Sequence, residues 1–187
     1  TASPLVIGVV YFLFVFGIGK DALMPFHRWL PAAMVAPIPV SALLHAVAVV
    51  KAGVFAILKV TIYVFGPDLV RGNGASSWLL WIAAGTIVIA SLVALYQDNL
   101  KQRLAYSTIS QLSYVVLGAL LANTAGIIGG SMHIVMHAFG KITLFFCAGA
   151  ILVVTNKTEI SQMAGLGRRM PLTMGAFLIA SISIAGL

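Results

Sequence analysis

Long apolar runs separated by short polar turns dominate the pattern of this chain. A membrane-spanning helix needs about 20 mostly apolar residues, and runs of this kind cover 39–65, 78–97, 104–122 and 127–154. A further apolar run, 171–187, is interpreted as the start of a last span. The pattern therefore predicts an all-α protein that crosses a bilayer several times.

The first apolar region, residues 4–36, is interrupted. It contains an apolar stretch, then GKDALMP, then the amphipathic PFHRWLPAAMVA. Gly19 and Pro25 both weaken a continuous helix there. The pattern leaves two arrangements open: a helix followed by an amphipathic surface helix, or one broken spanning helix with Lys20 at the break. Irregular backbone at membrane depth is tolerated where it faces protein or water, as in the ion sites of transporters.

Composition agrees with a membrane protein. Of 187 residues, 61% are hydrophobic and 8% are charged, with a mean hydropathy of +1.08, whereas soluble domains carry about 25% charged residues. The class is a polytopic membrane protein of about six transmembrane helices, counting the broken one. The chain begins at Thr1 without methionine and stops inside an apolar run, so we interpret 1–187 as one transmembrane module, truncated at both ends.

The formal net charge is +7, but the basic residues are scattered, which argues against a nucleic-acid surface. Lys and Arg concentrate in cytoplasmic loops of membrane proteins. Loops 98–103 and 155–170 carry five Lys and Arg residues together, whereas the loop 66–77 carries only Arg71. The two basic loops are therefore predicted to be cytoplasmic, or on the equivalent matrix or stromal side.

Three proton-binding side chains follow one face of the run 127–154. His133, His137 and Lys141 are four residues apart, and each such step turns by about 40° on a helix, over roughly 12 Å in total. Waters would have to bridge groups at that spacing. A charged lysine at the bilayer centre costs a few kcal/mol, and histidine titrates near physiological pH. The pattern favours a proton path; structural hydrogen bonds between helices are the alternative.

The run 39–65 repeats this theme. Lys51 is about 18 Å from the helix start, near mid-bilayer. His45, six residues earlier, faces a different direction. Lys59 is nearer the other end, where snorkelling to the interface and a functional role are equally compatible with the pattern.

Hydroxyl groups line the run 104–122 as a polar strip. From this strip, Ser110 and Tyr114 are candidate secondary members of the path, although plain helix packing also explains them. The sequence contains no motif typical of a metal or cofactor site. There is no CxxC, Walker A or HExxH sequence, and the histidine pair has no third ligand nearby. A haem held by His45 with His133 or His137 is an alternative, but it would leave the lysines unexplained. We predict no metal and no cofactor.

Three stretches resemble the signatures of the antiporter-like proton-translocating subunits, a family that includes complex I membrane-arm subunits, membrane hydrogenases and Mrp-type cation/proton antiporters. They are GKDALMPFHRWLPAAMVAPIPVSALLHAVAVVKAGVF, DNLKQRLAYSTISQLSYVVLG and HIVMHAFGKITLFFCAGAI, in the expected order. The first is most similar to the D-type component of the Mrp antiporters. One departure is Gln102, where many members have a basic residue.

The resemblance implies a larger fold of about fourteen helices with inverted repeats, in which 4–36 is a broken helix. It implies that Lys20 pairs with a glutamate outside this chain, and that Lys20, His45, Lys51, His133, His137 and Lys141 form a proton pathway. It also implies other membrane subunits as partners, protons as the transported ions with sodium as a second candidate, and a bacterial or archaeal inner membrane. The function expected is proton translocation in a multisubunit antiporter. The alternatives are a component of a redox-driven pump and a haem- or quinone-binding membrane protein, and any enzyme activity stays open.

Overall fold

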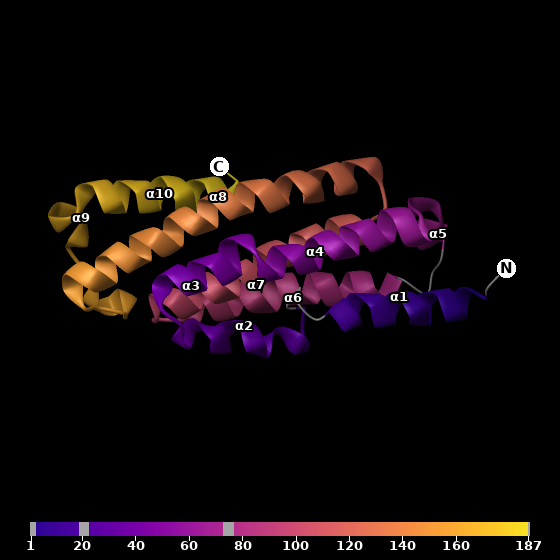
Figure 1. Ribbon diagram of the computed structural model, residues 1–187, viewed down its shortest axis with the longest axis horizontal. Helices are drawn as coiled ribbons and strands as arrows, with labels where there is room; N and C mark the ends of the chain where they lie inside the picture. The colour runs from indigo at the N-terminus through magenta and orange to yellow at the C-terminus, as the bar shows by residue number, and fades with distance from the viewer. Residues whose placement is uncertain (1–2, 19–22, 73–76, 187) are drawn as a thin grey trace.

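The computed structural model describes residues 3–18, 23–72 and 77–186, and these form an elongated bundle of helices (Figure 1). The elements are α1 (Pro4–Ile18), η1 (Phe26–Arg28), α2 (Trp29–Ala32), η2 (Ala33–Val35), α3 (Ile38–Ala42), η3 (Leu43–Val47), α4 (Val49–Lys59), η4 (Val60–Phe65), α5 (Pro67–Gly72), α6 (Ser77–Tyr96), α7 (Leu100–Leu120), α8 (Thr124–Thr155), η6 (Ile160–Gln162), α9 (Leu166–Arg169) and α10 (Pro171–Ala185). Most of them run along the long axis of the bundle.

The predicted all-α membrane class is confirmed. Within the described ranges, three helical segments are long and apolar enough to cross a bilayer: Ile38–Phe65, Ser77–Tyr96 and Thr124–Thr155. Two shorter apolar helices, α1 and α10, accompany them. Large apolar side chains on the outside of the bundle are exposed, as expected of a surface that faces lipid. The protein is therefore an integral membrane protein.

The helix α7 occupies the centre of the bundle. It packs against α6, α8, α4 and the short α2, and most of its side chains are buried. Asn99 caps its first turn by accepting hydrogen bonds from the amides of Lys101 and Gln102, at 3.1 and 3.2 Å. The helix therefore begins at Leu100, four residues before the apolar run. Because α7 faces protein on several sides, it can carry hydroxyl groups that a lipid-facing helix would expose.

The region 4–36 is helical on both sides of the expected break. The structure describes helix up to Ile18 and again from Phe26, with Pro25 immediately before η1. In Figure 1, α1 and α2 lie end to end along one side of the bundle. Gly19 and Lys20 lie outside the described residues.

The segment Ile38–Phe65 is not a uniform α-helix, in contrast to the simple run expected at 39–65. Leu43–Val47 and Val60–Phe65 are π-helical, and the amide of Ala48 donates to the carbonyl of Leu43, five residues back, at 3.0 Å. Single π-turns within α-helices are frequent at functional sites. Here the wider turn contains His45 and precedes Lys51, so it changes the angle between these two side chains.

Candidate functional site

One face of α8 presents the three titratable side chains that its spacing predicts. His137 and Lys141 are each 1% exposed, and the imidazole rings of His133 and His137 stack with centroids 5.8 Å apart at 27°. A separation of four residues places side chains one above the other on a helix. The face is therefore turned into the protein at His137 and Lys141, and both side chains are almost fully shielded from solvent.

Lys51 of α4 reaches across to this face. Its ammonium nitrogen lies 2.6 Å from Nδ1 of His137 and donates to the carbonyl of Ile134 at 3.0 Å. An ammonium group can only donate, so with charged Lys51 the Nδ1 atom must accept and the ring proton sits on Nε2. Lys51 is itself 5% exposed. The two helices thus bring together two titratable groups that are 86 residues apart in the sequence.

Lys141 reaches the other way, toward α7. Its ammonium nitrogen donates to the Oγ of Ser107 at 2.5 Å and to the carbonyl of Leu104 at 3.0 Å. The hydroxyl of Ser107 in turn donates to the same carbonyl at 3.0 Å. Both acceptors are neutral, so this buried lysine is solvated by dipoles instead of a carboxylate. The series from Lys51 through His137 to Lys141 therefore joins α4, α8 and α7.

His45 is fully buried beside this series. Its ring packs against Phe145, one helical turn beyond Lys141, with centroids 5.4 Å apart. Neither of its ring nitrogens has a hydrogen-bond partner among the described residues, and the same is true of Nε2 in both His133 and His137. Buried polar atoms are nearly always paired with protein or ordered water. These four nitrogens mark positions where water would complete the hydrogen bonding.

Several sequence-predicted residues lie at the margin of this arrangement. Ser110 is buried and hydrogen-bonded to Ser91 of α6 at 2.7 Å. Tyr114 is 47% exposed, with its ring 6.4 Å from that of His133. Lys59 is exposed and stands over the rings of Phe55 and Tyr63 at 5.4 and 5.7 Å, a placement typical of a lipid-interface lysine.

Lys20 lies outside the described residues, so its place in the series stays a prediction. Among the described residues, no three His, Cys, Asp or Glu side chains gather in a group that could hold a metal ion. His137 turns Nδ1 toward Lys51, which leaves Nε2 as the ring nitrogen without a partner in the described part of the chain.

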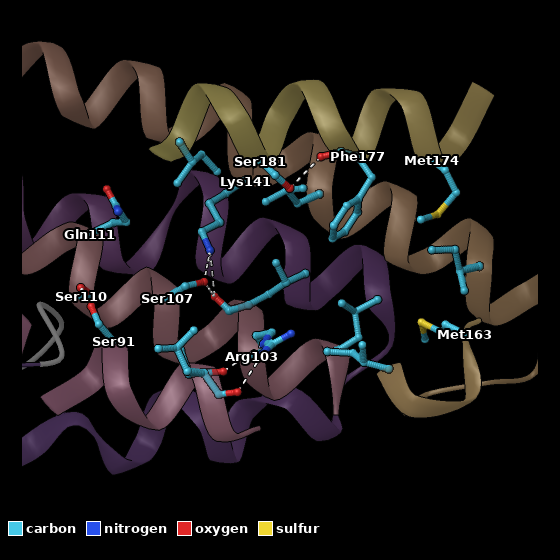
Figure 2. A pocket seen from close by; sticks show the side chains of 18 of the residues that line it. Ser91, Arg103, Ser107, Ser110, Gln111, Lys141, Met163, Met174, Phe177 and Ser181 are labelled. Carbon is cyan, nitrogen blue, oxygen red and sulfur yellow. Dashed lines mark hydrogen bonds between the residues drawn. The ribbon is translucent and has the colours of Figure 1, made fainter. Parts of the chain in front are cut away.

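A cavity of about 740 Å³ adjoins Lys141 between α6, α7, α8 and α10 (Figure 2). Its polar lining includes Ser107, the direct partner of Lys141, which the sequence pattern places only in the polar strip. The signal that could have singled out Ser107 is its place on α7 one turn before Ser110 and Gln111, which also line the cavity. The carbonyls of Ile134 and Leu104 could not be found from sequence, because main-chain acceptors carry no residue signature.

Comparison with known proteins gives one consistent group of matches. The model of the family described as NADH:quinone oxidoreductase/Mrp antiporter, TM, matches residues 1–187. The NADH-quinone oxidoreductase subunit N of Desulforudis audaxviator is 38% identical over 190 residues, which cover 99% of this chain and 37% of the relative. A probable K⁺/H⁺ antiporter subunit of the A/B type from Rhizobium meliloti is 38% identical over 181 residues, covering 96% and 18%.

Solved structures share the fold, and two of them illustrate it. A chain of the archaeal membrane-bound sulfane sulfur reductase superposes with a TM-score of 0.84 at 32% identity, covering 99% of this chain and 38% of that one. A chain of the Mrp complex from Dietzia sp. superposes with a TM-score of 0.77 at 29% identity, covering 98% and 22%. This chain thus spans well under half the length of these relatives. The matches include components of oxidoreductases and of antiporters alike, so they do not single out the Mrp type.

Proposed function

Because this chain belongs to the NADH:quinone oxidoreductase/Mrp antiporter transmembrane family, we propose that it is the proton-conducting core of a translocating membrane subunit. It works within a multisubunit complex, as the word "subunit" in the names of its relatives suggests. Protons are the transported species, with sodium as a candidate exchange partner. The chain itself supplies no redox cofactor.

The observation that carries this proposal is the contact of 2.6 Å between Lys51 and His137. At this distance a proton can pass from the lysine ammonium to Nδ1 without an intervening water. The imidazole then releases its other proton from Nε2, which faces no protein partner among the described residues. Lys51 loses one proton, the water beside Nε2 gains one, and the ring is returned to neutrality with its tautomer exchanged.

The remaining steps need water. Lys141 lies one turn beyond His137 on α8. After it has released its own ammonium proton toward the cavity, its neutral amine accepts the next proton through water, and the unpaired nitrogens of His45 offer a second position for such water. From Lys141 the hydroxyl of Ser107 leads into the cavity. Lys20, paired with an acid outside this chain, would load the other end of the path. Buried lysines that have no carboxylate partner within the described ranges are costly in a membrane, and a role in proton conduction explains why the protein keeps them.

Orientation belongs to the same proposal. The basic loops at 98–103 and 155–170 lie at one end of the bundle, where the main chain of Leu100 and Ile160 bonds to Thr158 and Asp98. By the positive-inside rule this end faces the cytoplasm. For the host we propose a bacterial or archaeal inner membrane, because the matching structures include an archaeal membrane complex.

The test is ion transport in inverted membrane vesicles, using the full-length parent protein in its native assembly and a pH-sensitive dye. Lys141→Ala should abolish proton movement while the protein still inserts, and Lys59→Ala, at the exposed lysine, should leave it unchanged. Normal transport by Lys141→Ala would overturn the proposal.

The same vesicles separate the two transport modes. A pH change on adding sodium, without any electron donor, indicates an Mrp-type antiporter. Acidification only on adding NADH or another donor indicates a redox-driven pump. A haem absorption band in the purified protein would instead favour the cofactor-binding alternative.

A further inference from the structure

The cavity beside Lys141 has two chemically different ends. Its inner end, at the left of Figure 2, is polar: Lys141, Ser107, Ser110 and Gln111 lie there, with Ser91 hydrogen-bonded to Ser110. The hydroxyl of Ser110 also donates to the carbonyl of Ile87 at 3.2 Å. The hydroxyl and amide groups of these side chains can form hydrogen bonds to a short file of water molecules that ends at Lys141.

The outer end of the cavity is apolar. Met163 and Met174 lie at the right of Figure 2. Leu100, Ile151 and Ile160 also line the cavity and belong to the same hydrophobic cluster as these two methionines. Apolar cavities stay dry, and hydrophobic constrictions in channels stop conduction by excluding water. The inner end of the cavity can therefore hold water, whereas the apolar side chains at the outer end, called the plug here, exclude it.

Part of this plug comes from the segment 156–165, which connects α8 to α9 and is called the strap here. Its residues Ile160, Met163 and Ala164 line the cavity. The strap is mostly exposed and has little core of its own. Such a segment opens at a smaller free-energy cost than the packed helices around it.

A set of hydrogen bonds holds the strap against the start of α7. The Ser161 hydroxyl donates to Oδ2 of Asp98 at 2.7 Å, and the Ser161 amide donates to Oδ1 at 3.0 Å. The main chain pairs alongside, from Ile160 to Asp98 at 2.8 Å and from Leu100 to Thr158 at 3.0 Å. The hydroxyl and amide of Ser161 hold the pKa of the Asp98 carboxyl below its usual range, so Asp98 is ionised and accepts both bonds at neutral pH.

We propose that the cavity is a water inlet to Lys141 and that the strap is its gate, latched by Asp98 and Ser161. With the latch closed, the apolar residues of the strap keep the outer end dry and isolate Lys141 from the loop side. When the latch opens, water enters past Arg103 and reaches the hydroxyl groups and the lysine. The role of this inlet in proton transfer rests on the proposed function. Whether water can reach Lys141 through the cavity is a separate question, which can be measured without a transport assay.

Access is measured by cysteine labelling, which does not depend on transport. The background is Cys147→Ala in the full-length protein within its assembly, because Cys147 is a free thiol in the described chain. Ser110→Cys places a thiol at the inner end of the cavity. Ser113→Cys is the matched control, since Ser113 is equally buried on α7, bonds the carbonyl of Ile109 and does not line the cavity.

A membrane-impermeant maleimide is applied to inverted vesicles, with and without Asp98→Ala. We expect Ser110→Cys to label slowly in the latched protein and several-fold faster with Asp98→Ala, while Ser113→Cys stays unlabelled in both. Ser161→Ala, which removes only one bond of the latch, should give an intermediate rate and serves if Asp98→Ala fails to assemble.

The gate is overturned if the latch variants do not change the labelling of Ser110→Cys. The inlet is overturned if Ser110→Cys stays unlabelled in every variant, or if Ser113→Cys gains as much as Ser110→Cys. Failure of the proposed function has a different signature. In that case Lys141→Ala keeps normal transport, whatever the labelling shows.

Discussion

The contact between Lys51 and His137 makes a quantitative prediction about proton transport. Lys51 is buried, and His137 supplies one of the two acceptors that the structure shows for its ammonium group. A hydrogen bond to a charged group contributes about 1.5–3 kcal/mol. If the proton crosses this contact, removing either partner raises the transport barrier by a similar amount, which is about 10- to 150-fold in rate.

A double-mutant cycle separates this contact from general damage. Lys51→Ala and His137→Ala should each slow transport by that factor, and the double variant should be no slower than the slower single variant. The coupling energy is then about 1.5–3 kcal/mol, in the range for residues in direct contact. The assay is the initial rate of dye response in vesicles, scaled to the amount of the protein in the membrane.

The control cycle pairs His137→Ala with Lys59→Ala. Lys59 is exposed and contacts aromatic rings on its own helix, so its effect should be small and should add to that of His137→Ala within about 0.5 kcal/mol. Additive losses for Lys51→Ala and His137→Ala would refute direct transfer between them.

Two further predictions concern packing, and both are checked by the thermal midpoint of the purified assembly. Tyr11→Phe removes a buried hydrogen bond of 2.7 Å to Thr61 and leaves the threonine hydroxyl bonded to its own helix, so we expect a loss of about 1 kcal/mol with transport unchanged; an unaltered midpoint would contradict this. Gly118→Ala places a Cβ atom 2.6 Å from the carbonyl oxygen of Gly126 and must separate α7 from α8, at a cost of about 1–3 kcal/mol, whereas Gly129→Ala meets open space and should be neutral; equal effects would refute the close approach.

The local sequence pattern was enough to predict the membrane-protein class and to place three titratable side chains on one helix face. Apolar runs set the class because a bilayer requires long apolar helices whatever their neighbours are. The spacing of His133, His137 and Lys141 gave their common face, because helix geometry relates residues four apart without any knowledge of the fold. The resemblance of three ordered stretches indicated the family, which the match over residues 1–187 confirms.

Contacts between helices could not be predicted from the local sequence pattern. The helical spacing predicts waters between His133, His137 and Lys141, but it says nothing about Lys51, which touches His137 directly. That contact depends on how close α4 lies to α8 and on the π-turn that precedes Lys51, and neither leaves a periodic signal. The apolar pattern also predicts too late a start for α7. Lys101 and Arg103 interrupt the apolar run within the first turn of the helix, which Asn99 caps.

The sequence by itself determined that this protein is a bundle of membrane helices and which side chains it carries at membrane depth. Hydropathy and helical period are properties of one segment, so a single chain suffices to read them. Only the tertiary structure decided which groups meet: Lys51 with His137, Lys141 with Ser107, and the strap with the first turn of α7. Each of these pairs joins residues far apart in the chain, and packing alone sets the distances that a proton transfer needs.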